Sequence, residues 1–211
     1  MLHRITLLQR NSSLSPSAFS RHWRTHHADI VKRMPGLTHY AQNHVVAAVT
    51  AAEPAFPVAG VVETWYRSGG HADSANSAPD DFAALLEDEL HLLSGSVALQ
   101  IRSQPEPLPE PAWKIWLHSP RADKRHLSGF LRPPGLPGLL DERLLLRDTT
   151  VPMLTREHLS APRETPDGVI ALAFDSEHQA REAMDAVTDR AAETLGMEDL
   201  QLLLTHEYRV L

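Results

Sequence analysis

The sequence predicts an α+β fold built from two tandem units, each with the element order β-α-β-β-α-β. A proline-rich segment, residues 103–112, divides the 211-residue chain into two nearly equal halves. In each half, short apolar runs typical of strands alternate with longer amphipathic runs typical of helices. Equal halves with the same pattern indicate an internal repeat. We therefore expect a first domain over residues 1–102, a linker over residues 103–112 and a second domain over residues 113–211.

The first half supplies the elements of one unit in order. Ser15 is a good helix N-cap, Pro16 suits the first helical position, and Pro35-Gly36 ends the helix. A second helix begins at the acidic residues that follow Pro79 and ends before Gly95. Strands are expected over residues 3–9, 37–47, 58–66 and 96–102. This order is that of the ferredoxin-like fold.

The second half fits the same order. Helices are expected over residues 121–131 and 176–195, and strands over residues 113–118, 139–151, 168–175 and 200–210. The prolines at 105, 107, 109 and 111 make the linker extended, because each fixes φ and removes a hydrogen-bond donor. The whole chain is thus expected to be a tandem repeat of one fold.

Composition excludes several classes of function. A net charge of -7 argues against a general nucleic-acid binder, which needs a concentrated basic face. The absence of cysteine excludes disulfides, thiol catalysis, iron–sulfur clusters and cysteine-type zinc sites. No apolar run approaches the roughly 18 residues of a membrane span. The first ten residues carry charges inside their apolar stretch, unlike a signal peptide. We expect a cytoplasmic protein with neither nucleic-acid nor membrane partners.

Residues 14–46 and 60–66 carry a specific set of motifs. They are Phe19, His22-Trp23, His27-Ala28, Pro35-Gly36, Tyr40, Asn43 and the strand GVVETWY at residues 60–66. The set closely resembles the signature of the EthD family, named for a protein of ethyl tert-butyl ether degradation. In the second half we find no His-Trp, no His-Ala and no Tyr-x-x-Asn, so the resemblance implies a degenerate second copy.

The resemblance implies a dimeric α+β barrel. In that superfamily two ferredoxin-like sheets pack into a barrel whose interior faces form a pocket for a small, mostly hydrophobic compound. Two copies in one chain can close such a barrel internally, and we also expect a homodimer. The superfamily includes cofactor-free monooxygenases, cyclases, dehydratases, decarboxylases, isomerases and haem enzymes, so fold alone does not give the reaction.

His27 is the first candidate catalytic residue. It lies on the apolar stripe of the first helix, four residues beyond Trp23 and three before Ile30. An imidazole there must find a hydrogen-bond partner, and it acts either as a general acid/base or as a structural tie between helix and strand.

His22 and His26 share one helix edge at i, i+4 spacing, which can bind a metal ion. No third ligand is recognisable in the sequence, so we expect a solvated pair and no metal.

Tyr40 and Glu63 are the other candidate catalytic residues. Tyr40 and Asn43 are three apart on a strand and therefore face opposite sides of the sheet. A phenol in a pocket can orient a carbonyl or donate a proton, and a tyrosine at a pocket rim is the alternative. Glu63 shares a strand face with Trp65. On an inward face the pKa of Glu63 would be raised and the residue could act as a base. On a face exposed to solvent it would be an ordinary surface glutamate. The expected substrate-binding residues are Trp23, Asn43, Trp65 and His22.

The favoured interpretation is an EthD-like enzyme acting on a hydrophobic, aromatic or polyketide-like metabolite. Its chemistry would be cofactor-free acid/base catalysis by His27 with Tyr40 or Glu63: dehydration, decarboxylation, isomerisation or oxygenation. One alternative is a non-catalytic carrier or accessory protein that holds a hydrophobic ligand for an oxygenase. Another is haem binding in the barrel, for which the 13 histidines offer ligands.

Overall fold

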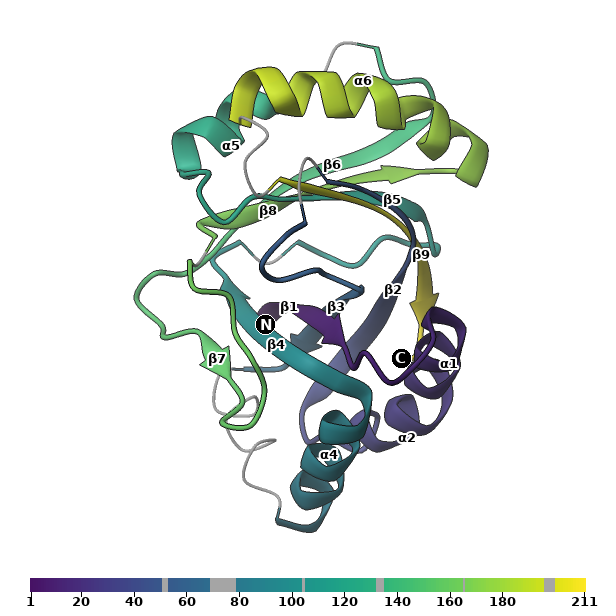
Figure 1. Ribbon diagram of the computed structural model, residues 1–211, viewed down its shortest axis with the longest axis vertical. Helices are drawn as coiled ribbons and strands as arrows, with labels where there is room; N and C mark the ends of the chain where they lie inside the picture. The colour runs from purple at the N-terminus through teal and green to yellow at the C-terminus, as the bar shows by residue number, and fades with distance from the viewer. Residues whose placement is uncertain (51–52, 69–78, 104, 132–134, 165, 196–199) are drawn as a thin grey trace.

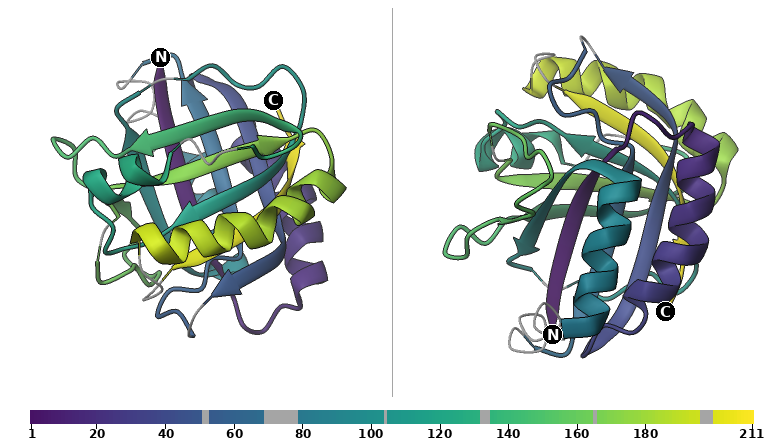
Figure 2. Two further views of the ribbon diagram at one scale, coloured as in Figure 1. Left: turned by 90° about the horizontal axis from the view of Figure 1, so that it is seen from above. Right: turned by 60° about the horizontal axis from the view of Figure 1, so that its bottom comes forward.

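The structure is a computed structural model that describes the chain except residues 51–52, 69–78, 104, 132–134, 165 and 196–199. One nine-stranded sheet, in the order β6-β8-β5-β9-β2-β3-β1-β4-β7, curls around a central axis. The helices cover its outside at two opposite ends (Figures 1 and 2). No helix in the described ranges is long and apolar enough to cross a membrane.

The first unit has the expected β-α-β-β-α-β order and the antiparallel strand order β2-β3-β1-β4. Ser15 caps its first helix as predicted, because its side chain accepts a hydrogen bond from the Ala18 amide at 3.1 Å. That helix is split by a π-helical turn, which the sequence did not predict. The elements are β1 (Leu2–Arg10), α1 (Pro16–His22), η1 (Trp23–His27), α2 (Ala28–Val31), β2 (Leu37–Thr50), β3 (Gly60–Tyr66), α4 (Pro79–Leu92) and β4 (Leu93–Ile101).

The second unit repeats the arrangement with the strand order β6-β8-β5-β9. The strand expected over residues 139–151 ends at Leu146, and the chain then forms β7, a two-residue strand that pairs with β4 of the first unit. The elements are β5 (Trp113–His118), α5 (Lys124–Phe130), β6 (Leu139–Leu146), β7 (Leu154–Thr155), β8 (Gly168–Phe174), α6 (Glu177–Leu195) and β9 (Gln201–Arg209).

Two seams close the barrel within one chain. At the first, β2 and β9 pair from Ala41–Arg209 to Thr50–Gln201. At the second, β4 meets the end of β6 through the Ile101–Arg147 bridge and the Arg102 N–Leu146 O hydrogen bond of 2.9 Å. The chain therefore forms the α+β barrel of two ferredoxin-like units that the sequence predicted.

The strands of each unit form one half of the continuous sheet, and these halves are called the first and the second sheet below. Central strands such as β3 and β8 are buried on both faces, because each half packs against helices outside and against the other half inside. One apolar cluster fills the space between the first sheet and α1, α2 and α4, and another lies between the second sheet and α5 and α6. A third fills much of the barrel interior. The interior is thus a packed core rather than the ligand pocket that the family resemblance implied.

The proline-rich linker crosses one end of the barrel. Its carbonyl groups accept hydrogen bonds from three side chains of the barrel: Trp65 Nε1 to Pro105 O at 2.9 Å, Arg143 to Glu106 O at 2.8 Å, and Arg209 to Pro109 O at 2.7 Å. The described residues of the linker form no helix or strand. Its role as a boundary between separate domains stays a prediction.

Candidate active site

A small cavity of about 110 Å³ lies between the helices of the first unit and the outer face of its sheet. The sheet contributes side chains from β1, β2, β3 and β4, and the helical layer contributes His27, Val31, Leu85 and Glu89. Leu154, Thr155 and Arg156, in and after β7, close one side, so the second unit completes a site of the first. The site therefore lies outside the barrel wall, whereas the sequence interpretation expected it inside.

His27 and Asp88 form a hydrogen-bonded pair beside this cavity. His27 is buried at the end of η1, and its Nδ1 lies 2.8 Å from Oδ2 of Asp88 on α4. A carboxylate only accepts hydrogen bonds, so Nδ1 carries the proton and Nε2 is left for a ligand. Burial raises the pKa of Asp88, but hydrogen bonds from His27 and His22 outweigh it, and the net pKa lies below its usual range. The pair has the geometry of an oriented general base.

The π-helical turn explains why several histidines reach the same carboxylate. The Ala28 amide bonds the carbonyl of Trp23, five residues earlier, and this wider turn brings residues five apart onto one face. His22 and His27 consequently both contact Asp88, with His22 Nε2 donating to Oδ1 at 2.5 Å. Helix α4 lies alongside α1 and α2 over the same sheet face (Figure 2). π-turns of this kind are frequent at functional sites.

Tyr40 lines the cavity from β2 at the inner end of a hydrogen-bond chain. Its hydroxyl accepts from Gln42 Nε2 at 2.7 Å, and Gln42 Oε1 accepts from His44 Nε2 at 3.0 Å. His44 Nδ1 in turn accepts from the Ser20 hydroxyl at 2.8 Å. An amide oxygen cannot donate, so every bond in the chain points toward Tyr40. Burial raises the pKa of Tyr40 despite these bonds, and the phenol keeps a proton that it can donate.

Charged groups lie at the other side of the cavity. Arg156 makes a bidentate ion pair with Glu89, at 2.7 and 3.3 Å. Arg4 from β1 lies over the ring of Tyr66, 5.5 Å from its centroid. Both guanidinium groups line the cavity together with apolar side chains such as Val31 and Leu85. This lining suits a compact molecule with an apolar body and a polar group.

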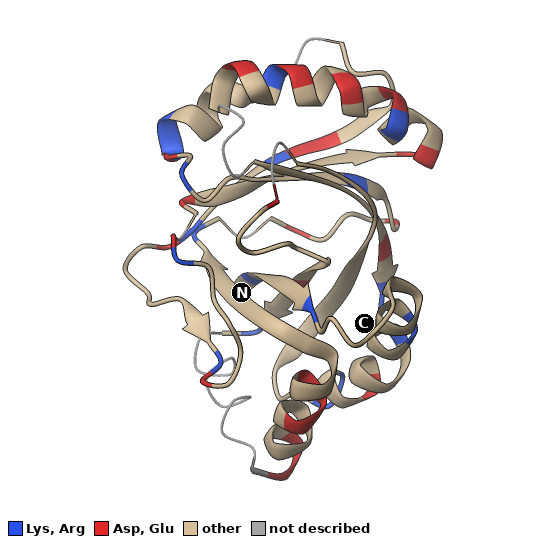
Figure 3. Ribbon diagram, in the orientation of Figure 1, with Lys and Arg blue, Asp and Glu red and all other residues tan. Residues whose placement is uncertain are grey.

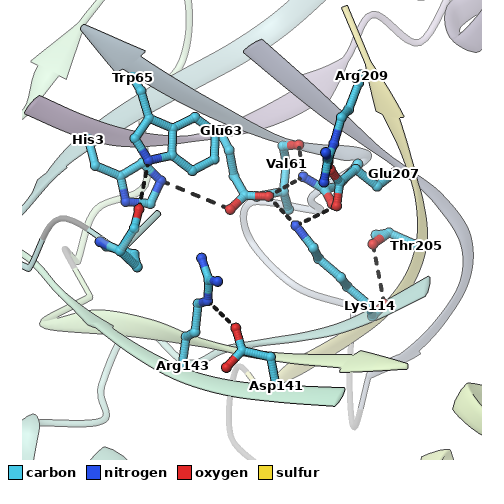
Figure 4. A network of polar contacts seen from close by, with 12 residues as sticks. His3, Val61, Glu63, Trp65, Lys114, Asp141, Arg143, Thr205, Glu207 and Arg209 are labelled. Carbon is cyan, nitrogen blue, oxygen red and sulfur yellow. Dashed lines mark hydrogen bonds and ion pairs between the residues drawn. The ribbon is translucent and has the colours of Figure 1, made fainter. Parts of the chain in front are cut away.

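Glu63 lies on the opposite face of the sheet, inside the barrel (Figure 4). Lys114 from β5 donates to Glu63 and also contacts Glu207 from β9 at 2.9 Å, and Asn43 donates to Glu63 at 3.1 Å. Burial raises the pKa of Glu63, but Lys114 outweighs it, so the net pKa is lowered rather than raised as the sequence interpretation supposed. Glu63 is thus a partner in a buried ion network.

Only two of the residues expected from the sequence to form the site lie at the same cavity. His27 and Tyr40 line one cavity, whereas none of the four expected substrate-binding residues lines it. Trp23 is packed in the core, and His22 lies on the solvent side of Asp88. Asn43 bonds Glu63 in the barrel interior, and Trp65 stacks there on His3 with ring centroids 4.4 Å apart. The residues that the sequence interpretation missed are Arg4, Tyr66, Asp88, Glu89 and Arg156.

The described cavities that a histidine lines do not fit a haem. A pocket for a molecule of that size needs roughly 300–1,000 Å³. The cavity at His27 has about 110 Å³, and the space beside Glu63 inside the barrel about 10 Å³. A larger groove of about 680 Å³ contains His44, but both of its ring nitrogens are already hydrogen-bonded. We therefore assign no role to haem.

Comparisons with known proteins agree with this architecture. Residues 11–96 match the EthD domain, and no curated protein matches the chain. An anthrone oxidase-like protein is 11% identical with a TM-score of 0.62, over 99% of this chain and 93% of that one. A provisionally described monooxygenase from Fusobacterium nucleatum is 10% identical with a TM-score of 0.51, again over 99% and 93%. Residues 11–96 are thus similar to the EthD domain, and the whole chain shares the α+β barrel fold of the anthrone oxidase-like protein.

Proposed function

We propose that this chain is an enzyme that performs acid/base chemistry on a small hydrophobic molecule bound between α2, α4 and the outer face of the first sheet. The hydrogen bond between His27 and Asp88 carries the proposal. It holds the imidazole in the tautomer whose Nε2 can accept a proton, at the edge of a cavity lined by both apolar and charged side chains.

The first step in this site is a proton transfer. His27 Nε2 takes a proton from an acidic C–H or phenolic O–H of the substrate, and the electron pair stays on the substrate as an enolate or phenolate. Asp88 stabilises the imidazolium that forms. Tyr40 donates a hydrogen bond to the oxygen that gains negative charge. Dehydration, isomerisation and reaction of the carbanion with dioxygen all begin in this way. In a decarboxylation the electron pair comes instead from the bond broken when carbon dioxide leaves, and the resulting carbanion is then protonated.

Oxygenation is the branch to test first, because both structural neighbours are named for oxidation reactions. We propose an aromatic or polyketide-like substrate and no cofactor. Such a substrate needs more room than about 110 Å³, so its entry moves part of the lining. The adaptable side is β7, which is only two residues long and pairs with β4 at two positions.

The barrel needs no second chain, because both seams are closed internally. The homodimer and the cytoplasmic location stay predictions. Native mass spectrometry of freshly purified protein measures the oligomer and shows any hydrophobic compound that co-purifies.

The decisive variant is His27→Gln, which removes the base but keeps a polar side chain of similar length. Turnover of a panel of anthrones and phenols, followed by absorbance and dioxygen consumption, is expected to fall about 10²–10⁴-fold. The matched control is His178→Gln, because His178 is exposed on α6 and should leave turnover unchanged. Full activity in His27→Gln overturns the assignment of the base. Ligand binding without turnover in every variant, wild type included, indicates a carrier instead.

A further inference from the structure

Asp88 has a second group of imidazole neighbours on the side that faces solvent. Its Oδ1 lies 2.5 Å from His22 Nε2 and 3.6 Å from His26 Nε2. The side chains of His22 and His26 are 25% and 65% exposed, whereas that of Asp88 is 5% exposed. One ligand atom from each of the three residues can be chosen so that all lie within 4.8 Å of one another.

We propose that His22, His26 and Asp88 bind a divalent transition-metal ion of the zinc class. Two imidazole nitrogens and one carboxylate oxygen are donors that zinc accepts, and three protein ligands leave a position for water. The sequence offered His22 and His26 without a third ligand. The fold supplies it from α4, more than 60 residues further along the chain.

The distances suit such an ion after a small adjustment. Bonds of about 2.0–2.2 Å to zinc separate two ligand atoms of a tetrahedral site by roughly 3.3–3.6 Å. The His26–Asp88 distance of 3.6 Å already meets this condition. The His22–Asp88 distance of 2.5 Å has to open by about 1 Å, and His22 is exposed enough to rotate. His91, whose ring centroid lies 5.1 Å from that of His22, borders the site as a further imidazole.

The surroundings support the site in two further ways. The other oxygen of Asp88 accepts a hydrogen bond from His27 at 2.8 Å, and partners of this kind orient a carboxylate that binds a metal. Helix α4 also carries several acidic residues, which favour the approach of a cation (Figure 3). The π-turn contains both His26 and His27. His26 lies near Oδ1 of Asp88, whereas His27 bonds Oδ2, so the metal site and the His27–Asp88 pair use different oxygens of the same carboxylate.

The test is metal binding by the full chain, with any histidine tag removed and bound metal stripped by a chelator. Isothermal titration calorimetry and native mass spectrometry with Zn²⁺ are expected to show one tight ion per chain, and Mg²⁺ no comparable binding. His26→Ala and His22→Ala should each weaken Zn²⁺ binding by at least about tenfold. His178→Ala is the matched control, since His178 is also a helical histidine with an acidic neighbour, Glu182, four residues later.

Two results would overturn the proposal: no Zn²⁺ binding by the wild-type chain at millimolar concentration, or equal binding by the wild type and both site variants. Circular dichroism verifies that each variant is folded, and the exposure of His26 makes its variant the safer of the two. The readout needs no substrate, so its outcome is independent of whether His27 is a catalytic base.

Discussion

At the scale of single residues, Trp23 and Gly60 show how closely the first helix approaches the sheet. Trp23 is fully buried, and a Cβ atom added at Gly60 would lie 2.5 Å from Cζ3 of its indole. Gly60 is therefore required by contact with the ring. Trp23 is part of the EthD-like motif, and its position indicates a role in fixing the π-turn against β3 rather than in binding substrate.

We predict that Gly60→Ala lowers the free energy of unfolding by about 1–3 kcal/mol, because the ring has to move within a close-packed core. The matched control is Gly129→Ala on α5, where the nearest atom to a new Cβ is 3.6 Å away. That change should be neutral or slightly stabilising, since alanine is favoured in helices. Urea denaturation of both variants checks the prediction. Equal effects at the two glycines would contradict it.

The sequence pattern of the strands predicted part of the candidate site. It could not predict the rest, because strand alternation does not show which face of a sheet holds the cavity. Strand alternation correctly placed Tyr40 and Asn43 on opposite faces of the sheet. It could not tell which face holds the cavity, because all seven residues of β3 are buried, on both faces. Glu63 was therefore grouped with His27 and Tyr40, although those two residues line the cavity outside the barrel and Glu63 bonds Lys114 inside it.

At the scale of elements, Lys114 joins strands of both units. It lies between Glu63 of β3 and Glu207 of β9, so its ammonium group compensates the buried carboxylate of Glu63 and shares that of Glu207 with Arg209. Burial lowers the pKa of Lys114, but the two carboxylates outweigh it, and the net pKa is raised. Removing such a partner leaves uncompensated charge in the interior.

Lys114→Met is therefore expected to cost about 3–5 kcal/mol at neutral pH. In the wild type the pKa of Glu63 is lowered, so its contribution to stability is present above about pH 4.5 and is lost as the pH falls. Without Lys114 the buried carboxylate of Glu63 has a higher pKa and protonates at a higher pH. The difference in unfolding free energy between wild type and variant should therefore narrow between pH 7 and about pH 4. Urea denaturation over this range measures it, with the exposed Lys124→Met as control. A difference independent of pH would refute this account.

The helix that supplies Asp88 shows what an amphipathic pattern can and cannot reveal. The apolar stripe of α4 was predicted, and Asp88 lies between Leu85 and Leu92 along it. A carboxylate on the apolar side of a helix is a signal that could have been used. The π-turn and β7 left no comparable signal, because both arise from contacts between segments distant in sequence.

At the scale of the whole molecule, the two units of one chain close the barrel between them. The β2–β9 seam and the shorter β4–β6 contact connect the two units around one packed interior. The tandem repeat could be inferred from the proline-rich boundary and the element order. The contribution of each unit to the candidate site could not be inferred, because the second unit lacks the motif residues and yet supplies Arg156 to the cavity.

The same double-sided burial makes the molecule sensitive to acid. Burial lowers the pKa of His3 and His118 to about 4, and burial together with Arg24 lowers that of His44 to about 3. Between about pH 6.5 and pH 4 the unfolded chain protonates these rings and the folded chain does not, so stability falls as the pH falls. Three histidines give a slope of about 4 kcal/mol per pH unit, at about 1.4 each. Urea denaturation from pH 7 to pH 4 measures this slope.

The variant His118→Leu should reduce the slope by about one third, because the His118 ring has no hydrogen bond within the described residues. The exposed His178→Gln should leave the slope unchanged. An unchanged slope in His118→Leu would mean that the folded chain protonates His118 with the barrel interior intact.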